Sequence, residues 1–282
     1  MSRRGRATGV SRVNVVRGTP WKDALISVLE PQSPYRPWQP AAGFEAGEAV
    51  IAVLDTDPVS VLAGVGIIGA DGDTGRALAA IDPFYRSGLM ELGTLNMLAD
   101  FKVMPDSEGV YYRNSPDDVV AVIGAYMRST AESLCGRTSL AEGRILLKSG
   151  GRCAGCRGTI GLTGADARDR IHIHTAATPQ AWEPVGNPSP RLTGGLPPQA
   201  AVPDWPAALC DLCNDSMKAG GFTNFLEFKF SLHPRCPVCS AQRTQSTMYG
   251  MPAGPVEEPW IATMGCCVEP FQWCCGSCDY RW

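Results

Sequence analysis

The sequence predicts an α+β protein built from several small domains, and three observations support this fold class. Two apolar runs rich in β-branched residues indicate a sheet in the N-terminal third. Leucine-rich and methionine-rich runs with capping residues indicate helices after it. Four Cys-x-x-Cys pairs in the second half indicate small metal-stabilised modules. A chain of 282 residues that is 44% hydrophobic is long enough for two or three domains.

Charge is segregated along the chain although the net charge is only −3. Residues 1–22 have six basic and no acidic side chains, which predicts a basic tail over residues 1–20. Residues 44–120 have thirteen acids against four bases, a net of −9, whereas residues 128–170 have eight bases against four acids, a net of +4. A polyanionic partner would therefore bind the tail or the later segment.

The N-terminal sheet begins near Glu48. The stretch EAVIAVLDTDPVSVLAGVGIIG contains two apolar runs separated by Asp-Thr-Asp-Pro, whose turn chemistry predicts a hairpin. We place this sheet in an acidic α+β domain over residues 21–136.

Three helices are predicted after the hairpin. The first covers residues 87–101, and the second runs from Ser115 to about Cys135, with a proline and two acids in its first turn. The third begins at the capping box of Ser139 and ends at Gly150. Residues 178–206 are dense in Pro and Gly and are predicted to form a long loop. Alternation from Leu226 to Leu232 predicts a half-buried strand.

Eight of the twelve cysteines form Cys-x-x-Cys pairs, here called knuckles: Cys153/Cys156, Cys210/Cys213, Cys236/Cys239 and Cys275/Cys278. Two knuckles can close a tetrahedral shell of four sulfurs at roughly 2.3 Å from one zinc ion. Two structural Zn²⁺ ions are therefore predicted. The alternatives are a disulfide framework, which is typical of small secreted chains, and a thioredoxin-like redox pair, which needs a single motif between a strand and a helix.

The spacing favours sequential pairing of the knuckles, although 22 residues between Cys213 and Cys236 also permit the two middle knuckles to pair. The last fifty residues, ending in Trp-x-Cys-x-x-Cys-x-x-x-Trp, resemble bacterial zinc ribbons. That resemblance implies a zinc ribbon over residues 233–282, with Trp273 and Trp282 packed on its second knuckle. Cys266, Cys267 and Cys274 are then spare and are interpreted as small buried hydrophobes.

Two of the three histidines lie in DRIHIHTAATP. Strand alternation puts His172 and His174 on one face, roughly 6.6 Å apart, and turns Ile171 and Ile173 into a core. The pair is interpreted either as structural or as a site where two imidazoles face one space.

The order knuckle, His-bearing strand, loop and LCDLCNDSMK resembles the zinc-stapled HNH endonucleases, which have a ββα-metal motif. The resemblance covers about residues 150–220, and we assign residues 137–232 to this module. It implies a general base at His174 or His172, a Mg²⁺ or Mn²⁺ ion on the scissile phosphate, support from Asn214, and a substrate contact from Lys218. The acid or histidine that usually precedes the base is replaced by isoleucine, and the loop asparagine is not located.

The N-terminal stretch AGFEAGEAVIAVLDTDPVSVLAGVGIIGADGD resembles PUA-like and EVE-type modules, which can read modified bases. A reader fused to a nuclease would suit restriction of modified DNA. The alternative is an ordinary α+β interaction domain, which the acidic charge favours because phosphate attraction supplies much of nucleic-acid affinity.

The sequence therefore predicts a metal-dependent endonuclease that acts on DNA, in restriction or phage defence. The rival is a non-catalytic zinc-bound scaffold that binds nucleic acid or a protein partner, and a cysteine-based oxidoreductase is a third reading. No apolar run reaches the roughly 18 residues that span a bilayer, and the basic start lacks the apolar segment of a secretion signal. We expect a cytoplasmic protein with no membrane partner.

Overall fold

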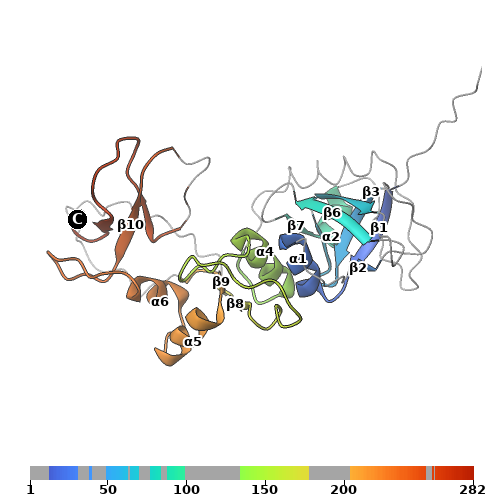
Figure 1. Ribbon diagram of the computed structural model, residues 1–282, viewed down its shortest axis with the longest axis horizontal. Helices are drawn as coiled ribbons and strands as arrows, with labels where there is room; N and C mark the ends of the chain where they lie inside the picture. Colours follow the sequence, from blue (N-terminus) through green and yellow to red (C-terminus); the bar gives the residue numbers. More distant parts are fainter. Residues whose placement is uncertain are drawn as a thin grey trace, which may run out of the picture. The chain divides into compact units, whose positions relative to one another are not determined.

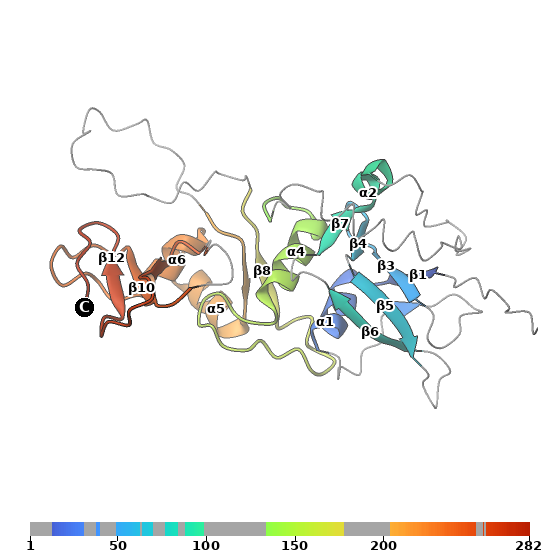
Figure 2. The same ribbon diagram turned by 90° about the horizontal axis from the view of Figure 1, so that it is seen from above.

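The computed structural model describes residues 13–30, 38–39, 49–62, 64–69, 77–83, 88–98, 134–177, 204–251, 256 and 258–282. The chain forms two compact units (Figures 1 and 2). Unit 1 comprises Met1–Ala177 and Pro206–Asp211, and unit 2 comprises Thr178–Trp205 and Leu212–Trp282. Both units contain helices and strands, which confirms the α+β class. The domain boundaries drawn from the sequence stay predictions.

Unit 1 contains a sheet of seven described strands with the order β2-β1-β3-β4-β7, to which β5 adds by pairing with β3 and β6. Strands β1 and β3 pair in parallel, and the crossover between them contains helix α1 followed by strand β2. The elements are β1 (Val13–Gly18), α1 (Trp21–Leu29), β2 (Trp38–Gln39), β3 (Ala49–Leu54), β4 (Ser60–Leu62), β5 (Gly64–Gly69), β6 (Ala77–Pro83), β7 (Leu89–Glu91) and α2 (Leu92–Leu98).

The predicted hairpin is confirmed. Strand β3 pairs antiparallel with β4, Val53 lying opposite Val61, and its first half pairs antiparallel with β5. The turn between β3 and β4 is closed from inside by the buried Thr56, whose hydroxyl lies 2.7 Å from both the Pro58 carbonyl and the Ser60 hydroxyl. Because β3 pairs with both β4 and β5, the sheet branches at this hairpin.

Helix α4 (Ser139–Ser149) packs against α1 in unit 1 (Figure 1). Gly143 permits the close approach, because a Cβ there would lie 2.7 Å from Leu89 Cδ1 and 3.2 Å from Leu25 Cδ1. Leu25, Leu89 and Leu146 are fully buried. The helix that leads into the first knuckle is thus part of the core under the N-terminal sheet.

The helix predictions had different outcomes. Residues 87–101 divide into strand β7 and helix α2 where they are described, and the helix predicted for residues 115–135 falls almost wholly outside the described residues. Helix α4 starts at Ser139 and ends at the left-handed Gly150, as predicted. The predicted capping role of Ser139 is wrong, because the cap is Thr138, whose hydroxyl accepts from Ala141 N–H. The Ser139 hydroxyl instead accepts from Asp57 N–H at 2.6 Å.

Unit 2 has a three-stranded sheet, in which β10 pairs in parallel with β11 and antiparallel with β12. Its aromatic core centres on Trp260, which meets Trp205 and Phe225 edge-on at ring distances of 5.8 and 5.6 Å. Most of helix α5 (Asp211–Ala219) also lies in this unit. The other elements are α6 (Phe225–Ser231), β10 (Thr244–Met248), β11 (Ile261–Thr263) and β12 (Trp273–Cys275).

The strand predicted for residues 226–232 is wrong, because this segment is helix α6. Asn224 caps the helix by accepting from Glu227 N–H at 3.1 Å. The alternation of apolar and polar residues predicted one solvent-exposed face that includes Lys229. Lys229 is only 4% exposed, and its ammonium lies 5.6 Å from the Trp260 ring centre. Burial on several sides of a short helix hides the helical period.

Candidate metal centres and histidine site

The eight knuckle cysteines form two groups of four, and within each group all sulfur atoms lie within 4.8 Å of one another. The first group is Cys153, Cys156, Cys210 and Cys213, and the second is Cys236, Cys239, Cys275 and Cys278. This is the sequential pairing favoured by the spacing. Each group is compatible with a zinc site and could hold one ion.

The sulfur separations fit a metal shell and not disulfides. Four sulfurs at about 2.3 Å from a tetrahedral ion are about 3.8 Å apart, whereas bonded sulfurs are about 2.05 Å apart. The Cys156–Cys210 sulfurs are 3.9 Å apart, Cys236–Cys278 3.6 Å and Cys239–Cys275 3.5 Å. None of the twelve cysteines, all of which lie in the described residues, forms a disulfide, so the disulfide framework considered from the sequence is not present.

Three of the four knuckles share one backbone geometry. The N–H four residues after the first cysteine donates to that cysteine's carbonyl, from Arg157 at 2.8 Å, Ser240 at 2.9 Å and Asp279 at 3.0 Å. These same three residues have left-handed φ values of 64°, 59° and 57°. The first cysteine's N–H donates to the carbonyl of the fifth residue on, at 2.9, 3.0 and 2.8 Å in Gly158, Ala241 and Tyr280.

The Cys210/Cys213 knuckle is different because it opens a helix. Cys210 immediately precedes α5, and Cys213 lies in the first turn. Cys210 N–H points at Cys153 Sγ at 3.4 Å. Backbone N–H donors and the positive end of a helix both stabilise thiolates, which are the form that binds metal. The first group therefore combines a tight knuckle with a helix start, whereas the second combines two tight knuckles.

Within the second group, the thiols of Cys236 and Cys278 have very different pKa values. Burial acts to raise the pKa of Cys236, but the N–H groups of Cys239 and Val238 outweigh it and lower the pKa to about 6. The N–H of Tyr280 acts to lower the pKa of Cys278, yet burial and the neighbouring thiols raise it to about 12. Cys236 is thus favoured as a thiolate before metal binds, whereas a metal must displace the proton of Cys278.

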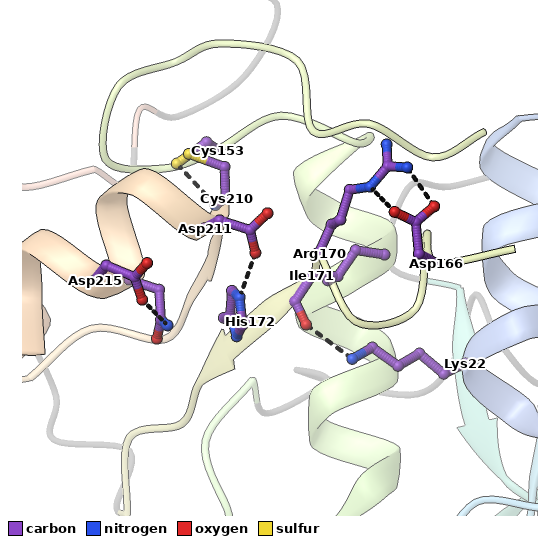
Figure 3. Close-up of polar contacts among 10 residues, drawn as sticks. Lys22, Cys153, Asp166, Arg170, Ile171, His172, Cys210, Asp211 and Asp215 are labelled. Carbon is purple, nitrogen blue, oxygen red and sulfur yellow. Dashed lines mark hydrogen bonds and ion pairs between the residues drawn. The ribbon is translucent and has the colours of Figure 1, made fainter. Parts of the chain in front are cut away.

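The predicted histidine strand is β8 (His172–His174), which pairs antiparallel with β9 (Ala207–Leu209) just before the Cys210/Cys213 knuckle. His172 Nε2 lies 2.7 Å from Asp211 Oδ1, at the first residue of α5 (Figure 3). Both side chains are partly exposed, at 31% and 54%. His174 is half-buried, Ile171 is buried, and Ile173 is only half-buried, so the predicted isoleucine core face is partly right.

Contacts with helix α1 fix the chain just before His172. Lys22 Nζ donates to the Ile171 carbonyl at 2.8 Å (Figure 3). Arg168 Nε donates to the buried Asp23 carboxylate at 2.9 Å. Burial lowers the pKa of Lys22, which Glu142 and Asp169 oppose. The strand that carries the histidines is therefore attached to the helix of the N-terminal sheet.

The two helix residues predicted from the HNH resemblance lie on α5. Asn214 is half-buried and donates to Asp215 Oδ1 at 3.3 Å, and Lys218 is exposed. They follow Asp211 by three and seven residues, so the three share one face of the helix. Sequence reasoning missed Asp211. Its signal was an acid in a helix first turn inside a knuckle, which by itself is only a dipole-stabilising residue.

In the segment predicted to be a zinc ribbon, residues outside the four-cysteine group also have defined places. Trp273 lies 4.8 Å from the His233 ring, and Trp282 stacks on Tyr280 at 6.0 Å. Cys274 is buried, as interpreted, and burial raises its pKa. Cys266 and Cys267 are exposed, so the interpretation of these two thiols as buried hydrophobes is wrong.

No family model, curated protein or solved structure matches the chain. Within the described part of the chain, every helix is too short or too polar to cross a lipid bilayer.

Proposed function

We propose that the Cys153/Cys156 knuckle, the paired strands β8 and β9 and helix α5 form a metal-dependent endonuclease site. This site would hydrolyse phosphodiester bonds in DNA. The observation that supports this most is the 2.7 Å contact between His172 Nε2 and Asp211 Oδ1. A carboxylate on one ring nitrogen fixes the imidazole tautomer and leaves the other nitrogen to accept a proton. His172 is accordingly the general base.

In this proposal Asp211 replaces the acid that the strand itself lacks. The residues before the two histidines are Ile171 and Ile173, which can neither bind a cation nor orient an imidazole. Helix α5 supplies a carboxylate from outside the strand, where the HNH resemblance alone gave no acid. Asp211 is a positioning residue, because it acts through His172.

The cleavage step follows from this arrangement. His172 Nδ1 takes a proton from a water molecule while Nε2–H keeps its hydrogen bond to Asp211. The water oxygen attacks the phosphorus, the bond from phosphorus to the leaving sugar oxygen breaks, and that oxygen takes a proton from solvent. A Mg²⁺ or Mn²⁺ ion, when bound, would stabilise the charge that develops on the phosphate oxygens. The neutral donors nearest in sequence, His174 and the Asn214 amide oxygen, are the proposed ligands. Lys218, charged and exposed, contacts a flanking phosphate.

The net positive charge of residues 128–170 agrees with a nucleic-acid substrate. Residues 128–170 have eight basic and four acidic side chains. Arg152 and Arg157 flank the first knuckle and are exposed. Positive side chains around a cleavage site attract phosphate and release counterions. Restriction of foreign or modified DNA would be the biological setting implied by the HNH and reader-module resemblances.

The test is a plasmid-nicking assay with Mg²⁺ or Mn²⁺ on the zinc-loaded chain, with unmodified and modified DNA. His172→Ala should lose on the order of 10²–10⁴-fold in nicking rate, the usual contribution of a general base. Asp211→Asn should lose roughly 10- to 100-fold, the usual effect of removing a partner that orients a ligand or base. Glu227→Gln, which neutralises an exposed carboxylate in the first turn of helix α6, should leave the rate unchanged.

Zinc content and thermal unfolding are measured on each variant, so that loss of activity is separated from loss of fold. Equal rates for the wild type and His172→Ala would overturn the proposal. Absence of nicking by the wild type on every DNA tested would instead support the non-catalytic scaffold, for which DNA or protein binding is then measured directly.

A further inference from the structure

The β10–β11 end of the ribbon gathers sulfur side chains that belong to neither of the two four-cysteine groups. Residues 248–251 and 264–267 contain three methionines and two cysteines in eight positions. The whole chain has only 12 Cys and 9 Met in 282 residues, so this density is several times the average. We call the five residues the sulfur tip: Met248, Met251, Met264, Cys266 and Cys267.

Backbone hydrogen bonds hold the two segments of the sulfur tip side by side. Met264 N–H donates to the Met248 carbonyl at 2.9 Å, and Gly250 N–H donates to the Gly265 carbonyl at 2.8 Å. Both glycines have left-handed φ values, 102° and 84°, and open space where a Cβ would be. Met251 and Cys266 each follow one of these paired glycine turns. The fold thus holds the backbones of the two sulfur-bearing segments side by side.

Core packing does not account for these side chains. Met251 is 91% exposed, Cys266 and Cys267 are exposed, and Met248 and Met264 are half-buried. Methionine and cysteine are among the residue types most often buried. Thioether and thiol sulfurs form only weak hydrogen bonds, so contact with water does little to stabilise these side chains at the surface. An exposed group of them is better explained by a ligand that prefers sulfur.

We propose that the sulfur tip binds one soft monovalent metal ion of the Cu(I) type. Thiolate and thioether ligands select Cu(I), whereas Mg²⁺, Ca²⁺ and Mn²⁺ prefer oxygen ligands. The two segments contain no His, Asp or Glu. The two thiolates of Cys266 and Cys267 are the anionic ligands, and Met251 and Met264 supply thioethers. Each thiol loses its proton to water on binding, and the copper enters and remains as Cu(I), so no electron is transferred.

The experiment is an anaerobic competition titration of the zinc-loaded full chain with Cu(I) held by a chromogenic chelator, while zinc release is followed with a second dye. The wild type should take up about one Cu(I) before any zinc is released. Cys266→Ser/Cys267→Ser should abolish this first equivalent, and Met251→Leu/Met264→Leu should weaken it at least about tenfold.

Two matched variants serve as controls. Cys135→Ser removes a cysteine outside the tip and outside both four-cysteine groups, and Met97→Leu removes a methionine that is 80% exposed on α2. Both should bind Cu(I) as the wild type does. Copper uptake that begins only with zinc release, or that is the same in the double serine variant, would overturn the proposal. None of these outcomes depends on nuclease activity, so this inference and the proposed function are tested separately.

Discussion

Single residues decide how closely the elements of unit 1 approach one another. A Cβ on Gly18 would lie 2.6 Å from Ala24 Cβ, 2.7 Å from the Trp38 ring and 2.8 Å from Leu54 Cδ2. Three different elements therefore meet at one position that has no side chain. Gly143 plays the same part between α4 and its neighbours. Neither glycine is distinguished in the sequence from the other glycines of the chain.

Gly18→Ala should destabilise unit 1 by roughly 1–3 kcal/mol. The added methyl group would clash with three neighbouring side chains, which cannot all move away. The control is Gly93→Ala on helix α2, where the nearest atom is the movable Glu91 carboxylate at 3.3 Å. That change should be neutral or stabilise by up to about 1 kcal/mol through helix propensity. Chemical denaturation followed by tryptophan fluorescence measures both. Equal midpoints for the two variants would contradict the packing argument.

At the scale of elements, the tight knuckle is a repeated unit with one strained position. Arg157, Ser240 and Asp279 occupy the left-handed region that favours glycine. The conformation is imposed by the paired backbone hydrogen bonds, which turn both cysteines toward one point. The strain is the cost of presenting two thiolates three residues apart.

Ser240→Gly should therefore stabilise the ribbon by about 1 kcal/mol, because glycine adopts this φ without a Cβ clash. Ser246→Gly, the same change inside strand β10, should destabilise it by roughly 0.5–1 kcal/mol. Thermal unfolding of the zinc-loaded chain measures both shifts. Shifts of the same sign in the two variants would refute the assignment of strain to the knuckle.

Zinc binding by the second four-cysteine group should weaken as the pH falls. The pKa of Cys236 is lowered to about 6 and that of Cys278 is raised to about 12, so at about pH 7 Cys236 is a thiolate while Cys278 is protonated until a metal displaces its proton. Lowering the pH adds protons that compete with zinc. Below about pH 6 Cys236 also takes a proton, so the affinity should fall more steeply there. Competition with a chelator at several pH values tests this, and an unchanged slope across pH 6 would contradict it.

At the scale of the whole molecule, the two four-cysteine groups are distributed differently between the units. Cys153, Cys156 and Cys210 belong to unit 1, whereas Cys213 is counted with unit 2. In unit 1, Lys22 and Asp23 of α1 bind the chain between the first knuckle and β8. The ribbon group lies wholly within unit 2. The N-terminal sheet and the first metal group should accordingly unfold together.

Elemental analysis should find about two zinc ions per chain, and about one in each of the variants Cys153→Ser/Cys156→Ser and Cys236→Ser/Cys239→Ser. Hydrogen exchange should then become faster in α1 and α4 for the first variant, and in β10 and β12 for the second. Exchange that stays slow in α1 and α4 without the first zinc would show that the N-terminal sheet folds independently of it.

The sequence by itself determined the features that depend on local chemistry. Knuckle spacing, the hairpin at residues 48–69, the histidine strand and the ends of α4 follow from turn residues, β-branched runs and caps, which act over a few residues. The same local patterns misassigned Leu226–Leu232, because a short helix buried on several sides has no clean period.

Only the tertiary structure decided what meets across long separations. Asp211 is 39 residues from His172, and the tip segments at 248–251 and 264–267 are joined by hydrogen bonds between backbones. Such contacts depend on how β9 pairs with β8 and how β11 pairs with β10, and pairing register is set by packing over the whole sheet. A carboxylate beside an imidazole is therefore a property of the fold that no spacing in the sequence specifies.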